Sequence, residues 1–244
     1  MKILYCGDSA VGGPANYLLG ILRHLKASVV HIPPDQKLNP KILNQKFDVI
    51  IFSDYSRQKV SAAVEQKILA QIESGTGFLM IGGWASFSGP FGGWHGSQIE
   101  KILPISCLAK DDRISFPGGA LIAVKHAHSM FDGLSFKNPP AVMGANDIRA
   151  KKNGQVLLTV RKIISVGNHL MLDPAEHPFL VIDSDPRKRI AALATDLAPH
   201  WCGGMVDWGC TTRKLPVRGK IFIEVGDAYI RFVSSLIRWL ANAR

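Results

Sequence analysis

The sequence has few cysteines and no long apolar run. Its four cysteines, Cys6, Cys107, Cys202 and Cys210, are too few and too scattered for the disulfide framework of a secreted protein. No apolar stretch approaches the roughly 20 residues that a helix needs to cross a bilayer. The first apolar run ends at Gly7-Asp8, which makes it too short for a signal-peptide core. We therefore expect reduced thiols and a cytoplasmic protein with no membrane partner.

Acidic residues are scarce relative to basic ones. The 244 residues include 29 Lys and Arg but only 19 Asp and Glu, which gives a formal net charge of +10 at pH 7. The basic residues stand in short separate pieces, such as Lys151-Lys152 and Arg187-Lys188-Arg189. Because nucleic-acid binding draws on clustered cations that release counterions, this dispersed pattern argues against a nucleic-acid partner.

Several motifs of cofactor and metal sites are missing as well. The loop that contains Gly7, Gly12 and Gly13 has neither the G-x-G-x-x-G pattern nor the P-loop lysine, so a flexible turn is a simpler interpretation than a phosphate cradle. The cluster from His200 to Cys210 has residue types that suit zinc, but its spacing matches no common zinc motif. The sequence therefore predicts neither a cofactor nor a metal.

Alternating strands and helices are the clearest positive signal. The segments 2–6, 28–32, 47–52 and 78–81 are apolar almost throughout, and helical spacing of apolar residues follows over 14–25 and 60–72. Strands that are apolar on both faces are typical of a parallel sheet covered by helices on both sides. The pattern therefore predicts an α/β fold with a parallel sheet flanked by helices.

The later part of the chain has a different pattern. Shorter candidate strands, including 189–194, are separated by polar turns, which predicts a more antiparallel, β-rich C-terminal half. Apolar positions over 221–240 predict a closing amphipathic helix. We interpret residues 1–244 as one domain. It comprises a parallel core over about 1–105, a β-rich part over 106–220 and a closing helix within 221–244.

The ends of the predicted parallel strands are the place to look for a site. In such sheets ligands bind beyond the carboxyl ends of the strands, where the loops converge. We expect a small polar ligand there. The candidate binding residues are Asp8, Asp54, Gly82, Gly83, Trp84, Ser86, His200 and Asp207.

The turn after the fourth strand is where an α/β enzyme often carries its nucleophile. Here that turn reads Gly82-Gly83-Trp84, and glycine has no side chain to attack with. Ser86 is the nearest hydroxyl, but it lacks the G-x-S-x-G spacing and a histidine fixed beside it. Ser86 and His200 are therefore weak catalytic candidates. A hydrolase or transferase that uses Ser86 or a bound metal stays an alternative hypothesis.

Four aromatic residues lie within eleven positions of this turn: Trp84, Phe87, Phe91 and Trp94. Such residues can line a ligand site, pack a loop onto the core or form a subunit interface. A third hypothesis is therefore a structural or assembly role in a homo-oligomer, with this aromatic loop between subunits.

Longer segments carry a family resemblance. The segments 75–89 and 98–105, the run from His128 to Leu134, and Thr195–Trp201 followed by Gly203–Trp208 resemble the glutamine amidotransferase-like family. This family is related to class I glutamine amidotransferase domains and to trehalose-utilisation-type proteins. The resemblance spans nearly the whole chain and implies a flavodoxin-like core.

The resemblance also implies which chemistry to expect. Class I enzymes carry a cysteine in a G-x-C-x-G elbow, with a histidine and a glutamate downstream. This chain has Ile81-Gly82-Gly83-Trp84 at the elbow and no downstream His-x-Glu pair. We therefore expect no glutaminase activity, which makes the chain a pseudoenzyme candidate. The likeness to trehalose-utilisation-type proteins suggests a carbohydrate-related ligand by analogy alone.

Overall fold

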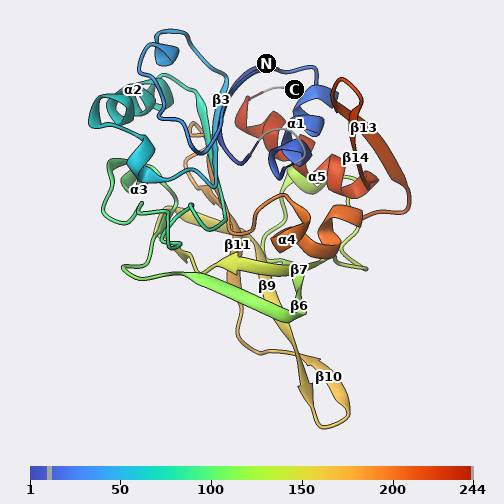
Figure 1. Cartoon of the computed structure of the whole chain (residues 1–244). Helices are drawn as coiled ribbons and strands as arrows, with labels where there is room; N and C mark the ends of the chain where they lie inside the picture. Colours follow the sequence, from blue (N-terminus) through green and yellow to red (C-terminus); the bar gives the residue numbers. More distant parts are fainter. Residues whose placement is uncertain (10–12, 243–244) are drawn as a thin grey trace.

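Five strands lie parallel in the central part of the molecule (Figure 1). The computed structural model describes residues 1–9 and 13–242, so the predicted loop residue Gly12 lies outside the described residues. The strands, in spatial order, are β2 (Ser28–Ile32), β1 (Lys2–Gly7), β3 (Val49–Ser53), β4 (Gly77–Ile81) and β12 (Ile190–Leu193). Every residue of β3, β4 and β12 is buried, as expected for strands covered on both faces.

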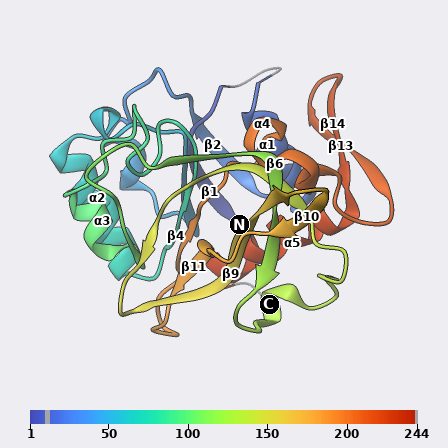
Figure 2. The ribbon, with the colours of Figure 1, turned by 90° about the horizontal axis from the view of Figure 1, so that it is seen from below.

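Helices cover both faces of this parallel sheet. Helices α1 (Ala15–His24) and α5 (Asp227–Leu240) lie on one face, and α2 (Ala62–Glu73) and α3 (Gln98–Ile102) lie on the other (Figures 1 and 2). Helix α2 begins where Ser61 caps it, because the Ser61 hydroxyl accepts from the Val64 N–H. Within the described part of the chain, no helix is long and apolar enough to span a membrane. The predicted flavodoxin-like α/β fold is confirmed.

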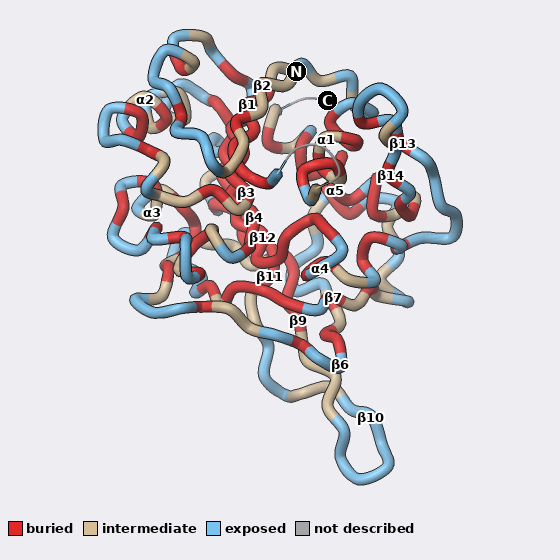
Figure 3. Tube along the Cα trace, in the orientation of Figure 1, coloured by how far each residue is buried: buried red, intermediate tan, exposed pale blue. Residues whose placement is uncertain are grey.

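Beyond β12 the same sheet continues with antiparallel strands. Their spatial order is β11 (His177–Asp183), β9 (Gly154–Val166), β6 (Arg113–Val124) and β7 (Ala141–Asn146), and β10 (His169–Leu172) pairs with the end of β9. The β9–β10 hairpin projects from the body as an arm and exposes Val166, Leu170 and Met171 (Figures 1 and 3). The predicted antiparallel character of the C-terminal half is thereby confirmed.

Shorter elements complete the described chain. Two small antiparallel pairs are formed by β5 (Ile105–Ser106) with β8 (Arg149–Ala150) and by β13 (Thr212–Arg218) with β14 (Ile221–Gly226). The short helices are η1 (Ile42–Asn44), η2 (Arg57–Lys59), η3 (Ser129–Phe131), α4 (Pro199–Cys202) and η4 (Gly203–Asp207).

Two expectations about the later chain are wrong in detail. Strand β12 does not belong to the antiparallel part alone, because it lies parallel to β4, with Leu193 opposite Ile81. The closing helix begins at Asp227 rather than at residue 221, because 221–226 forms strand β14. Burial alternates along 222–225, where Phe222 and Glu224 are exposed and Ile223 and Val225 are buried, and this is the period of a strand. At Gly226 a Cβ atom would stand 2.1 Å from the Trp208 carbonyl oxygen, so this crossing requires glycine.

An aromatic cluster anchors the loop after β4 to the core. The rings of Tyr55, Phe78 and Trp94 each lie 5.4 Å from the Phe52 ring, measured between centroids. Trp94 is fully buried, and its indole N–H donates to the Tyr55 carbonyl oxygen at 3.0 Å. Trp94 is therefore a core residue of a single chain, and its ring is not available to a subunit interface.

Replacing Trp94 tests this assignment. We expect Trp94→Ala to lower the free energy of unfolding by about 3–5 kcal/mol, because it removes a fully buried indole. The matched control is Trp84→Ala, which removes the same group from a site where it is 45% exposed and should cost far less. Urea denaturation measures both values. Equal losses in the two variants would contradict the core assignment.

Candidate functional site

Three of the parallel strands are each followed by an aspartate at their carboxyl ends, and we call this edge of the sheet the rim. Asp8 follows β1, Asp54 follows β3, and Asp196 lies shortly after β12. The three carboxylates lie close together. Besides burial, the charge of Asp8 raises the pKa of Asp54, and the charges of Asp8 and Asp54 raise the pKa of Asp196. None of the ion pairs among residues 1–9 and 13–242 involves any of them. The rim is therefore acidic, in a chain of net positive charge.

Asp8 is held by hydroxyl groups rather than by a cation. The Tyr5 hydroxyl donates to its carboxylate at 2.6 Å, and the Ser53 hydroxyl donates as well. Burial raises the pKa of Asp8 to about 6, although both hydroxyls act in the opposite direction. The backbone of Asp8 is in the left-handed region at φ 43°, and its N–H donates to the Ser53 carbonyl oxygen. This strained position fixes the carboxylate beside the end of β3.

Asp54 binds the turn that follows β4. Its carboxylate accepts from the Ala85 N–H at 2.7 Å and from the Trp84 N–H. Burial, followed by the charge of Asp8, raises its pKa to about 7, and the two N–H groups lower it in part. Like Asp8, Asp54 has a left-handed backbone, at φ 50°. The carboxylate thus occupies two amide N–H groups of the turn, so these donors are already satisfied within the chain.

The glycines of the turn lie against other groups of the chain and do not face open space. A Cβ atom at Gly83 would stand 2.1 Å from Oδ1 of Asp54, and one at Gly82 would stand 2.2 Å from the Ala194 carbonyl oxygen. Their N–H groups are also engaged: Gly82 donates to Leu193 and Gly83 to the Asn146 side chain at 2.9 Å. Both residues are buried, and they let the chain's own groups approach closely.

Ser86 has a structural set of hydrogen bonds. Its hydroxyl donates to the Ile81 carbonyl oxygen at 2.5 Å and accepts from the Asp54 N–H at 3.0 Å. The side chain is buried, and none of the hydrogen bonds among the described residues joins it to a histidine. His95 instead contacts the Cys107 carbonyl oxygen. Ser86 therefore positions Asp54, and this geometry does not present it as a nucleophile.

His200 and Asp196 come from the segment after β12. Asp196 accepts from the Ala198 N–H at 2.7 Å and from the Cys202 N–H, so its carboxylate contacts the segment that forms the short helix α4. Burial, followed by the charge of Asp8, raises the pKa of Asp196 well above its usual range. His200 is exposed on α4, and its charge lowers the pKa of Asp54 in part. The residues that act on Asp54 therefore come from the ends of β1 and β4 and from helix α4.

Trp84 and Asp207 lie at the outer edge of this group. Trp84 is 45% exposed, and the Arg113 guanidinium stacks over its ring at 4.2 Å. Asp207, at the end of η4, is exposed, and its charge raises the pKa values of Tyr17 and Cys202. The exposed side chains nearest to Asp54 in this group are therefore the Trp84 indole and the His200 imidazole, and Asp207 lies at the end of η4.

Three participants were not expected from the sequence. Asp196 and Tyr5 are described above, and Asn146 forms the third contact to the turn. The Asn146 amide donates to Gly83 and to Asp112 at 2.7 Å, and burial raises the pKa of Asp112 to about 6. Asp196 lies shortly after the end of β12. If this strand had been recognised as parallel from the sequence, that position would have identified Asp196 as a site residue.

The cysteines do not supply a reactive thiol to this rim. Cys6 and Cys202 are buried, and burial raises their pKa values well above the usual range. Cys210 is exposed, but it lies beside Asp227 at the start of α5. Over the described ranges 1–9 and 13–242, no group of three or more histidine, cysteine, aspartate or glutamate side chains has a geometry that could hold a metal ion.

The fold and this rim define a class of α/β protein of the flavodoxin-like type. A family model described as "Putative glutamine amidotransferase" matches residues 13–215, so the chain belongs to this glutamine amidotransferase-like family. A search of curated proteins gives no match.

Solved structures share the fold. A cytoplasmic protein from Salmonella typhimurium has a TM-score of 0.66 at 22% identity, over 84% of this chain and 92% of that one. A ThuA-like protein from Bacteroides uniformis has a TM-score of 0.59 at 13% identity, over 98% of this chain and 90% of that one. A second cytoplasmic protein, from Salmonella typhimurium LT2, has a TM-score of 0.65 at 24% identity, over 83% and 91% of the two chains.

The contact between Gly83 and Asp54 can be tested by a double-mutant cycle. We expect Gly83→Ala to lower the free energy of unfolding by about 1–3 kcal/mol more than Gly96→Ala, because only the first methyl group meets a neighbour. Both glycines have positive φ, so Gly96→Ala controls for backbone strain. In an Asp54→Ala background the excess should disappear. An excess that persists there would show that Asp54 is not what excludes the methyl group.

The raised pKa of Asp54 predicts how stability varies with pH. The folded chain binds this proton more tightly than the unfolded chain, whose aspartates have a pKa of about 3.9. Deprotonation therefore costs the folded state more, and stability is lost as pH rises from about 4 to about 7. Asp54→Asn removes this loss. The free energy of unfolding of the variant, relative to that of the wild type, should therefore increase from pH 4 to pH 8, as measured by urea denaturation. The exposed Asp35→Asn is the control, and a parallel pH profile for both variants would refute the prediction.

Proposed function

We propose that this chain is a cytoplasmic, amidotransferase-like protein without glutaminase activity, and that it binds a small polar ligand at the carboxyl ends of its parallel strands. The observation that carries the proposal is the rim itself. Where a class I enzyme presents an attacking thiol, this chain has Gly83, and the Asp54 carboxylate fills the adjoining space. A thiol nucleophile therefore has neither a side chain nor room at this turn.

The chemistry of the rim indicates the kind of ligand. Asp8, Asp54 and Asp196 are acceptors when ionised, and no cation of the described chain pairs with them. A ligand that donates hydrogen bonds through hydroxyl or ammonium groups would satisfy them, whereas a polyanion such as nucleic acid would be repelled. Sugars and amines both offer such donors, and a carbohydrate-related ligand agrees with the resemblance to trehalose-utilisation-type proteins.

We infer that three residues would meet such a ligand directly. Asp54 is partly exposed, and Trp84 and His200 are exposed beside it. Trp84 would supply an apolar ring face, and His200 would supply a donor or acceptor at neutral pH. Gly82, Gly83 and Ser86 would shape the turn from behind, and Asp207 would lie at the edge. Their part in binding stays a prediction.

The proposal predicts saturable binding with a defined loss in two variants. Glucose, glutamine and putrescine represent a polyol, an amino acid and a diamine, and thermal-shift titration at pH 7 measures each. We expect at least one to raise Tm in a saturable manner, because a ligand that binds only the folded state stabilises it. Trp84→Ala and His200→Ala should weaken that binding about tenfold, whereas Phe91→Ala and His169→Ala should not.

Two results would contradict the proposal. One is an unchanged affinity in both the Trp84→Ala and His200→Ala variants. The other is ammonia release from glutamine that scales with the amount of protein across two independent purification routes. The formation of a homo-oligomer stays a separate prediction, and it is tested by measuring solution mass.

A further inference from the structure

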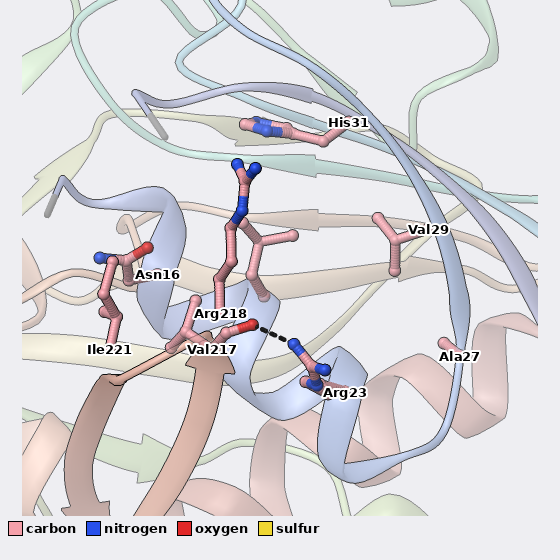
Figure 4. A pocket seen from close by; sticks show the side chains of 9 residues that line it. Asn16, Arg23, Ala27, Val29, His31, Val217, Arg218 and Ile221 are labelled. Carbon is pink, nitrogen blue, oxygen red and sulfur yellow. Dashed lines mark hydrogen bonds between the residues drawn. The ribbon is translucent and has the colours of Figure 1, made fainter. Parts of the chain in front are cut away.

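A cavity lies apart from the acidic rim. It has a volume of about 450 Å³ and is bordered by helix α1, strand β2 and the β13–β14 hairpin (Figure 4). This volume falls within the range of small-molecule sites, which is roughly 300–1,000 Å³. The lining residues are Asn16, Leu19, Arg23, Ala27, Val29, His31, Val217, Arg218 and Ile221.

The charged groups of this cavity have one sign. Arg23 and Arg218 both line it, and no carboxylate is among its lining residues. Among the ion pairs that the described residues form, none includes either arginine. The Arg218 side chain points toward His31 (Figure 4). An anion bound here would therefore meet an uncompensated guanidinium, which is the preferred partner of a carboxylate.

The apolar part of the cavity is preformed. Gly20 lets helix α1 approach the hairpin closely, because a Cβ atom there would stand 2.7 Å from Cδ1 of Ile223. The Arg23 guanidinium donates to the Val217 carbonyl oxygen at 2.6 Å and ties the helix to β13. This bond uses one of the donors of Arg23 and leaves others for a ligand. The hairpin is thus fixed over α1, and the ligand does not have to organise it.

We propose that this cavity binds a small organic anion, namely a carboxylate with a short aliphatic body. The carboxylate would pair with Arg218, and the aliphatic body would lie against Leu19, Val29 and Ile221. Both parts are needed, because the lining is mostly apolar and the Arg218 guanidinium lies apart from that of Arg23, which is bonded to Val217. The acidic rim would repel the same ligand, so this site is independent of the function proposed above.

His31 connects the cavity to the rim. Its Nε2 lies 2.8 Å from the Gly7 carbonyl oxygen, and because a carbonyl only accepts, Nε2 is the donor in this bond. The His31 ring packs on Tyr5 at 4.7 Å between centroids, and Tyr5 donates to Asp8. A ligand beside His31 would therefore touch a residue that holds the end of β1.

Calorimetric titration with hexanoate tests the proposal. At pH 7 and low ionic strength we expect saturable one-site binding to the full chain. Hexanamide keeps the aliphatic body without the charge, and acetate keeps the charge without the body, so each should bind at least about tenfold more weakly. Arg218→Ala should raise the Kd for hexanoate about tenfold or more, because it removes a charge-assisted hydrogen bond.

Two further variants make the outcome decisive. Arg213→Ala removes the same charge from an exposed position of the same strand outside the cavity, and it should leave the Kd unchanged. Ala27→Phe keeps both arginines but fills the cavity, and it should abolish binding. A cooperative thermal transition checks that each variant is folded. Absence of saturable binding to the wild type, or equal losses in Arg218→Ala and Arg213→Ala, would overturn the proposal.

Discussion

The rim of the sheet depends on the contact between the Asp54 carboxylate and the turn after β4. Asp54 accepts from the N–H groups of Trp84 and Ala85, and its own N–H donates to Ser86. Gly83 makes this contact feasible, because any side chain there would occupy the position of the carboxylate. Here the turn is closed by a group from the neighbouring strand.

The second constraint is electrostatic. Burial raises the pKa of Asp8 to about 6. Burial, followed by the charge of Asp8, raises the pKa of Asp54 to about 7 and shifts the pKa of Asp196 in the same direction. Close to neutral pH these groups therefore hold protons in part, and they can donate as well as accept. A cationic ligand would displace those protons, whereas a hydroxyl-bearing ligand would share them. The acidic rim and the basic cavity near His31 would therefore select ligands of different charge.

Much of the fold could be predicted from the sequence, and the misses have physical causes. Near-continuous apolar runs identify β1, β3 and β4, and their ends then identify Asp8 and Asp54. The parallel direction of strand β12 could not be predicted, because four apolar residues do not show whether their partners run parallel or antiparallel. For the same reason Asp196, which follows this strand, was not predicted as a site residue. The residues 221–225 fit either period over so short a length. The closed state of Gly82 and Gly83 could not be predicted, because it depends on which side chain faces them across the sheet.

The place of β12 has a consequence for how this protein could be divided. This strand is supplied by the last quarter of the sequence, yet it fills the edge of β4 and begins the link to β11. A fragment that stopped near residue 105 would leave the backbone of β4 unpaired on one side, with its amides open to self-association. Loss of the C-terminal half would therefore also remove a strand of the parallel sheet.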